Sequence, residues 1–272
     1  MKLLAIGDAH GNLEKIKEIS LKDVDLILLT GDLGKADLAR KKFFENIERK
    51  KQGLPELEET LKDAKAMHYE IHNSTIALLK YLSKHARVYA IEGNVGIPIK
   101  SEVKKLNKNF GINLPCTMDK ISLMNKVNIV KNRLRVFDGL RVGFLDYFMD
   151  VSWMKDFKPS DYKKRMKNAK KDTEKARKVL KRFGKLDILV CHQPPYGILD
   201  RVSFLGAPKH WQGKHAGSKA ILEYIKKYQP KYVFCGHIHE SKGMKKIGRT
   251  EVYNLGVAGW KIVEFESHHN NI

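Results

Sequence analysis

Seven polar residues that can bind metal ions recur along this chain, each shortly after an apolar run. The stretches that carry them read GDAHG, GD, GN, CH and GHIH. The seven residues are Asp8, His10, Asp32, Asn94, His192, His237 and His239. Two carboxylates, one amide and four imidazoles form an oxygen and nitrogen donor set without a thiolate. Such a set suits Mn²⁺, Fe, Zn²⁺, Ni²⁺ or Co²⁺ and does not resemble a structural zinc site.

The number of donors favours two metal ions over one. Seven ligands exceed what one transition metal binds, but they suffice for two ions if one carboxylate bridges them. Two ions about 3.5–4 Å apart are the usual arrangement for displacement at phosphorus. Each motif alone has a simpler interpretation, because GD or GN after a strand can be a capped turn and a single histidine can be a core residue. Because five such motifs occur in one chain, a metal centre is favoured over five unrelated turns and core residues.

Short apolar runs that read as strands position these residues. They are KLLAI (2–6), LILLT (26–30), VYAI (88–91), LDILV (186–190) and YVFC (232–235). Between them, NLEKIKEIS, residues 56–83 and SKAILEYIKKY carry apolar residues at helical spacing. Alternating strands and helices indicate an α/β fold, and ligands bind such sheets at the carboxyl ends of the strands. We therefore expect the seven donors to meet at one sheet edge.

Two strand pairs are predicted outside this pattern. LRVFDGLRVGFL (134–145) places Asp138-Gly139 between two apolar runs, which is a strong hairpin signal. EVYNL (251–255) and WKIVEF (260–265) predict a second hairpin. We expect one domain over residues 1–266, with helical and basic insertions at about 34–86 and 150–185, and a short tail at 267–272.

The motifs GDAHG, GDL, GN, H and GHIH, in this order, resemble the calcineurin-like metallophosphoesterase family. The resemblance extends from residue 1 to about residue 265. It implies a four-layer α/β/β/α sandwich with a two-metal site at the carboxyl ends of the strands. It also implies that Asp32 bridges the two ions. One ion would be held by Asp8, His10, Asp32 and His239, and the other by Asp32, Asn94, His192 and His237.

The chemistry implied by the resemblance is hydrolysis of phosphoester bonds by a hydroxide that bridges two divalent metal ions, for example manganese. A phosphodiester, in a nucleotide or a nucleic acid, is favoured over a monoester. The alternative is a non-catalytic or weakly catalytic interaction or scaffold protein on the same fold.

The third motif departs from the family pattern. Many members read Gly-Asn-His, with that histidine assigned to protonating the leaving group, whereas here Val95 follows Asn94. Valine cannot transfer a proton, so another residue supplies the acid or the acid is lost. We expect Asn94 to donate its amide hydrogen to a phosphoryl oxygen. His215, in GKHAGSKAI, is a candidate for binding a phosphoryl oxygen or protonating the leaving group, and its alternative role is a surface-loop histidine.

Positive charge is concentrated in one segment of a basic chain, whose net charge is +21. Residues 155–185 hold fourteen basic and four acidic residues, a net charge of +10, and read as a long polar helix. Trp153, Phe157 and Tyr162 near its start suggest base stacking, so the segment could bind a nucleotide or nucleic acid. The alternative is a solvated helix face in a lysine-rich protein.

The remaining composition predicts a cytoplasmic protein. No run of about 18 apolar residues is present, and MKLLAIGDAHG becomes polar too early for a signal peptide. The three cysteines form no CxxC pair, which fits a reducing compartment. We expect no membrane partner, and the oligomeric state stays open.

Overall fold

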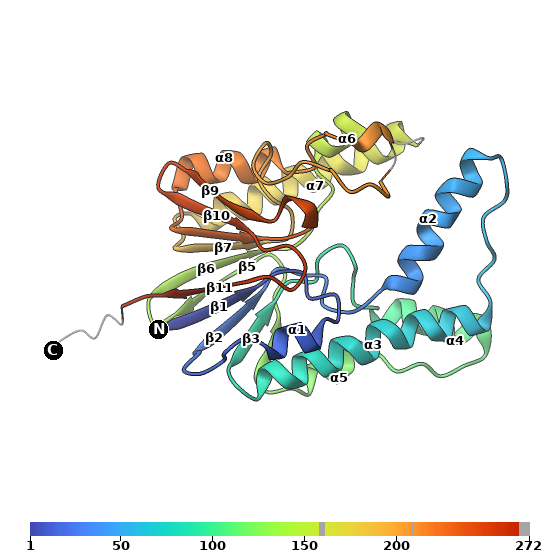
Figure 1. Cartoon of the computed structure of the whole chain (residues 1–272), viewed down its shortest axis with the longest axis horizontal. Coiled ribbons are helices and arrows are strands. Elements are labelled where there is room, and N and C mark those ends of the chain that lie inside the picture. Colours follow the sequence, from blue (N-terminus) through green and yellow to red (C-terminus); the bar gives the residue numbers. More distant parts are fainter. Residues whose placement is uncertain (158–160, 208, 267–272) are drawn as a thin grey trace.

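The computed structural model describes residues 1–157, 161–207 and 209–266, whose strands form two sheets (Figure 1). The first sheet has the strand order β11-β1-β2-β3-β4. Its strands are β1 (Lys2–Ile6), β2 (Leu26–Leu29), β3 (Arg87–Ala90), β4 (Val127–Ile129) and β11 (Trp260–Glu264). β1 to β4 run parallel, and β11 pairs with β1 in the antiparallel sense.

The second sheet has the strand order β5-β6-β7-β8-β10-β9. Its strands are β5 (Arg133–Phe137), β6 (Leu140–Leu145), β7 (Ile188–Cys191), β8 (Tyr232–Cys235), β9 (Gly243–Ile247) and β10 (Thr250–Asn254). The central strands β6, β7, β8 and β10 are parallel, while β5 and β9 are antiparallel edge strands.

Helices cover the outer face of each sheet (Figure 1). The first sheet is covered by α1 (Leu13–Lys17), α3 (Leu61–Ser83) and α5 (Thr117–Ser122), and the second by α7 (Tyr162–Phe183) and α8 (Lys219–Tyr228). Three more helices lie beyond the carboxyl ends of the strands: α2 (Asp37–Lys51), α4 (Lys100–Phe110) and α6 (Val151–Phe157). The arrangement is the expected α/β/β/α sandwich.

Side-chain alternation along the central strands produces these four layers. In β1, Leu3 and Ala5 belong to the core between the two sheets, while Leu4 and Ile6 pack toward the helices. β2 and β7 divide their side chains in the same way. Because both faces of each central strand are buried, these strands read as continuous apolar runs in the sequence.

The first predicted hairpin is confirmed and the second is wrong. β5 and β6 pair around Asp138-Gly139, whose φ angles of 46° and 86° allow a tight turn. β10, however, pairs with β8 and β9 in the second sheet, while β11 pairs with β1 in the first. The apolar pattern of residues 251–265 shows two strands but carries no information about their partners.

The basic segment forms two helices, α6 and α7, where the sequence predicted one. The face of α7 that carries Ala176, Val179, Leu180 and Phe183 packs on the second sheet, so the helix is part of the outer layer. Residues 158–160 of this segment and the predicted tail at 267–272 lie outside the described residues. The single-domain assignment stays a prediction.

Candidate metal centre

All seven predicted ligands lie just beyond the carboxyl ends of five parallel strands. Asp8 and His10 follow β1, Asp32 follows β2 and Asn94 follows β3, all in the first sheet. In the second sheet His192 follows β7, and His237 and His239 follow β8. The two sheets therefore each contribute donors to one site at their common edge.

A first group of donors forms around Asp8. His239 Nε2 lies 3.1 Å from Asp8 Oδ2, and His10 Nε2 lies 3.3 Å from His239 Nε2. The ligand atoms of these three residues all lie within 4.8 Å of one another, a distance range that one metal ion can span. His10 Nε2 also lies 3.7 Å from Asp32 Oδ2.

A second group forms around Asn94. Its Oδ1 lies 2.6 Å from His192 Nε2 and 2.7 Å from His237 Nδ1. Asp32 Oδ2 lies 3.6 Å from His192 Nε2. Oxygen and nitrogen donors gathered at these distances suit a divalent cation, so both groups fit divalent metal ions.

Asp32 is better placed than Asp8 to join the two groups. His192 Nδ1 lies 3.6 Å from Asp8 Oδ1, but it donates its hydrogen to the Thr30 carbonyl at 2.9 Å. That bond leaves the lone pair of a neutral ring on Nε2, which faces Asp32. Asp32 Oδ2 thus lies near a donor of each group, His10 and His192.

Backbone geometry directs these side chains into the site. His10, Asp32 and His237 have φ angles of 43°, 43° and 65°, which are uncommon outside glycine. The left-handed conformation turns the chain sharply at the strand end. Gly93, with φ of 83°, lies so close to Asp32 that an added Cβ would be 2.3 Å from Asp32 Oδ1. The backbone of the candidate metal ligands is therefore locally strained, and Gly93 packs closely against one of them.

Backbone amides also fix the two carboxylates. The Val95 N–H donates to Asp32 Oδ1 at 2.7 Å, and the His237 N–H donates to Asp8 Oδ2 at 2.5 Å. Position 95 thus contributes its backbone to the site, although its side chain lacks the proton expected from the family pattern. The bond to Asp32 Oδ1 leaves its Oδ2 near His10 and His192, whereas Asp8 Oδ2 lies near both the His237 N–H and His239 Nε2.

Thr30 is a site residue that sequence reasoning missed. Its hydroxyl donates to Asp8 Oδ1 at 2.8 Å, its carbonyl accepts the bond from His192, and its side chain is fully buried. The signal in the sequence was one polar residue at the end of the apolar run LILLT, directly before Gly31-Asp32.

Electrostatic interactions set the charge of the donors. Burial lowers the pKa of His237 to about 3, and the neighbouring His192 adds to this shift. Burial by itself raises the pKa of Asp8, but His192 and the hydrogen bond from His239 outweigh it and hold this pKa well below its usual range. Burial lowers the pKa of His192, but the charges of Asp32 and Asp8 raise it by more. The pKa of His192 is therefore above its usual value. A neutral His237 and an ionised Asp8 both keep the lone pairs that metal binding needs.

His215 has different neighbours. Its Nδ1 lies 2.7 Å from Asp200 Oδ1, and its ring lies 5.3 Å from that of Tyr196. Asp200 in turn accepts the backbone N–H groups of Gly197 and Gly217 through its Oδ2. Among the described residues, these contacts do not connect His215 to the seven donors, and its catalytic role stays a prediction.

The model of the calcineurin-like phosphoesterase family matches residues 1–241 of the chain. The chain belongs to the calcineurin-like phosphoesterase family. The matched range ends two residues after His239 and so contains every predicted metal ligand. Within the described residues, no helix has both the length and the apolar character needed to cross a membrane.

Other proteins are similar to this chain over most of its length. The uncharacterised protein MJ1162 from Methanocaldococcus jannaschii is 25% identical over 256 residues, which cover 93% of this chain and 87% of that protein. One crystal structure with 16% identity has a TM-score of 0.59 and covers 96% of this chain and 94% of its own, so it shares the fold. TT1561 of Thermus thermophilus has 16% identity and a TM-score of 0.47, with coverage of 95% and 90%.

Proposed function

We propose that this calcineurin-like phosphoesterase hydrolyses phosphoester bonds with two divalent metal ions, and that phosphodiesters of nucleotides or nucleic acids are preferred over monoesters. One observation carries the proposal: Asp32 Oδ2 lies 3.7 Å from His10 Nε2 and 3.6 Å from His192 Nε2. A single carboxylate between two histidine-containing groups is the arrangement that two adjacent cations require.

In this proposal the seven donors divide between the two ions as the family resemblance implies, with Asp32 shared. When bound, the ion pair supplies an activated water nucleophile and neutralises charge on the phosphoryl group. The protein orients this chemistry through Thr30 and the backbone of Val95, which hold Asp8 and Asp32. Asn94 Oδ1 faces two imidazoles, which turns its amide hydrogens away from them and toward a phosphoryl oxygen.

The absence of a histidine at position 95 limits the leaving groups. Without a proton donor there, esters whose leaving oxygen is stable as an anion react fastest, and alkyl esters react slowly. A diester carries a second organic group, and a cavity that begins at His237 and His239 provides space for it. These two features support diesters with an aryl leaving group, including aryl esters of nucleotides, as the first substrates to test.

A groove on the second sheet supports a polymeric substrate. Lys175, Lys178 and Arg182 of α7 line it together with Arg133 and Arg135 of β5. Lys131 also lines it, and six cations in one groove attract a phosphate backbone, so binding should weaken steeply with salt. The test is a double variant that carries Lys175→Glu and Lys178→Glu. If its affinity for single-stranded DNA and the salt dependence of that affinity are unchanged, the groove does not bind the nucleic acid.

The main experiment compares metal-stripped protein with protein reloaded with Mn²⁺, Zn²⁺ or Ni²⁺. Hydrolysis of bis(4-nitrophenyl) phosphate should appear on reloading and exceed that of 4-nitrophenyl phosphate. Asp32→Asn should lower kcat by roughly 10³-fold, because it weakens both metal sites at once. Asp187→Asn, at the opposite end of β7, is the control. A metal-loaded protein that is inert toward both esters would support the scaffold alternative.

A further inference from the structure

A cavity of about 530 Å³ opens directly from the metal centre. His237 and His239 line it at one end, and Tyr147 lies beside them. The Tyr147 ring centroid is 5.5 Å from that of His237 and 5.8 Å from that of His192. Any group attached to a phosphate at the metal ions would have access to this space.

The far wall of the cavity is aromatic. Trp153 stacks on Phe157 with a centroid distance of 5.0 Å and an angle of 13°, and Trp211 meets Phe157 edge-on at 5.4 Å. Phe157 is 1% exposed, and Val202 and Ile238 complete the cluster beneath it. Because close packing fixes these rings, the wall is preorganised for a planar ligand.

Helix α2 supplies the side of the cavity opposite this wall. Phe44 lies 6.4 Å from Phe204, measured between ring centroids, and the Arg40 guanidinium lies 5.9 Å from the same ring. Phe204 is 46% exposed. Glu240 accepts the backbone N–H groups of Ser203 and Phe204 at 3.0 Å and so holds this loop in place. Arg40 adds a positive charge to a cavity that is otherwise largely apolar.

We propose that this cavity binds the nucleobase of a nucleoside phosphodiester whose phosphate lies at the metal centre. The proposal rests on the proposed phosphoesterase function and names its substrate class. A base stacks on aromatic side chains without needing specific hydrogen bonds, and the Arg40 guanidinium in the lining supplies a cation for the adjoining phosphate. The volume lies within the usual range for small-molecule sites. An alkyl chain fits less well, because Arg40 and Glu240 add charged groups to the lining.

The kinetic experiment uses two diesters with the same leaving group: thymidine 5′-(4-nitrophenyl phosphate) and methyl 4-nitrophenyl phosphate. The protein should prefer the thymidine ester in kcat/KM. Trp211→Ala should reduce that preference by roughly 5- to 150-fold, the usual effect of removing one stacking ring, and mainly through KM. Trp211→Phe should restore most of it. Tyr69→Ala removes an aromatic side chain that is 40% exposed on α3 and should leave the preference unchanged.

A binding experiment tests the cavity without turnover. Trp153 and Trp211, two of the three tryptophans, line the cavity, so their fluorescence reports on it. With chelator present, adenosine 5′-monophosphate should quench this fluorescence saturably, whereas ribose 5-phosphate should not. Equal responses to both compounds, or no response to either, would overturn the proposal.

The two experiments separate two kinds of failure. If metal-loaded protein hydrolyses neither diester, the proposed function fails, and the adenosine 5′-monophosphate titration still decides the inference. If both diesters react equally well and Trp211→Ala slows them equally, the phosphoesterase stands and the nucleobase site is wrong.

Discussion

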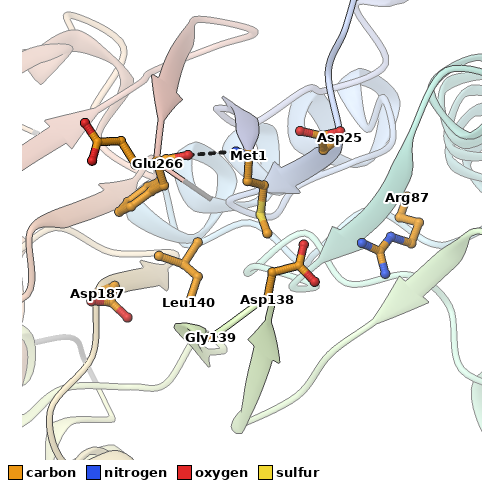
Figure 2. Close-up of a pocket in the computed structure, with 9 residues that line it drawn as sticks. Met1, Asp25, Arg87, Asp138, Gly139, Leu140, Asp187 and Glu266 are labelled. Atoms are coloured by element: carbon orange, nitrogen blue, oxygen red, sulfur yellow. Dashed lines mark hydrogen bonds between the residues drawn. The ribbon is translucent and has the colours of Figure 1, made fainter. Parts of the chain in front are cut away.

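Cavities of similar volume lie at the two ends of the parallel strands, yet only one has the chemistry of a metal site. The cavity beside the metal centre measures about 530 Å³, and a second cavity at the amino ends of the strands measures about 500 Å³. Figure 2 shows the second one. Its charged side chains come from separate elements: Asp25, Arg87, Asp138, Asp187 and Glu266.

Two of the carboxylates at the amino ends accept hydrogen bonds from backbone N–H groups. Asp25 Oδ2 accepts the Lys2 N–H at 2.7 Å, and Asp187 Oδ2 accepts the Arg141 N–H at 2.8 Å. Each bond ties the start of one strand to its neighbour. At the carboxyl ends, by contrast, histidines accompany the acids and left-handed residues turn them toward one another. In the part of the chain that is described, the acidic and histidine groups able to hold a metal ion lie at these ends. Asp138 at the amino ends also has a left-handed φ of 46°, so the histidines are what distinguish the two ends.

Gly93→Ala should have the largest effect in this comparison. The new Cβ would lie 2.3 Å from Asp32 Oδ1 and 2.6 Å from the Asp32 backbone nitrogen, so Asp32 must shift. A displacement of about 1 Å in a catalytic site can cost on the order of 100-fold in kcat/KM. The matched control is Gly139→Ala at the other end, where φ is 86° and no atom lies within 4 Å of the added Cβ. It should cost about 1–3 kcal/mol of stability without changing activity. Equal losses of activity in the two variants would contradict this distinction.

Thr30→Val should have an intermediate effect. It removes the hydroxyl that donates to Asp8 while keeping the shape of the side chain. Loss of such a supporting bond typically weakens metal affinity by about 10- to 100-fold. Calorimetric titration of chelator-treated protein with Mn²⁺ measures this change.

Thr250→Val is the control for this measurement. Thr250 is also fully buried, and among the described residues its hydroxyl has no hydrogen-bond partner. Its replacement should leave Mn²⁺ affinity unchanged. If the two variants bind Mn²⁺ alike, Thr30 does not support the metal centre.

Asp187→Ala should have the smallest effect. It removes the acceptor for the Arg141 N–H, which costs about 1–2 kcal/mol of folding free energy. Urea unfolding should record this loss, while kcat on bis(4-nitrophenyl) phosphate stays unchanged. A fall in kcat would show that the amino-end cavity takes part in the reaction.

The strands and the candidate metal ligands were readable from the sequence for a local reason. Strands buried on both faces need an unbroken apolar run, and KLLAI and LILLT show it directly. Because each donor follows its strand within a few residues, the parallel strands bring the donors to one edge. The motif order and spacing then indicated the family, which the match over residues 1–241 shows.

Other features depended on partners that are distant in the sequence, and only the tertiary structure decided them. The apolar pattern could not tell that β10 and β11 belong to different sheets, because hydrogen-bond pairing is not encoded in alternation. Nothing near His215 predicted its contact with Asp200. The aromatic cavity combines Phe44, Trp153 and Trp211, which lie on three separate segments. The sequence alone determined the donors and the strands that carry them, since both are local. The partners and the cavity required the folded chain, since packing joins residues that no short-range pattern connects.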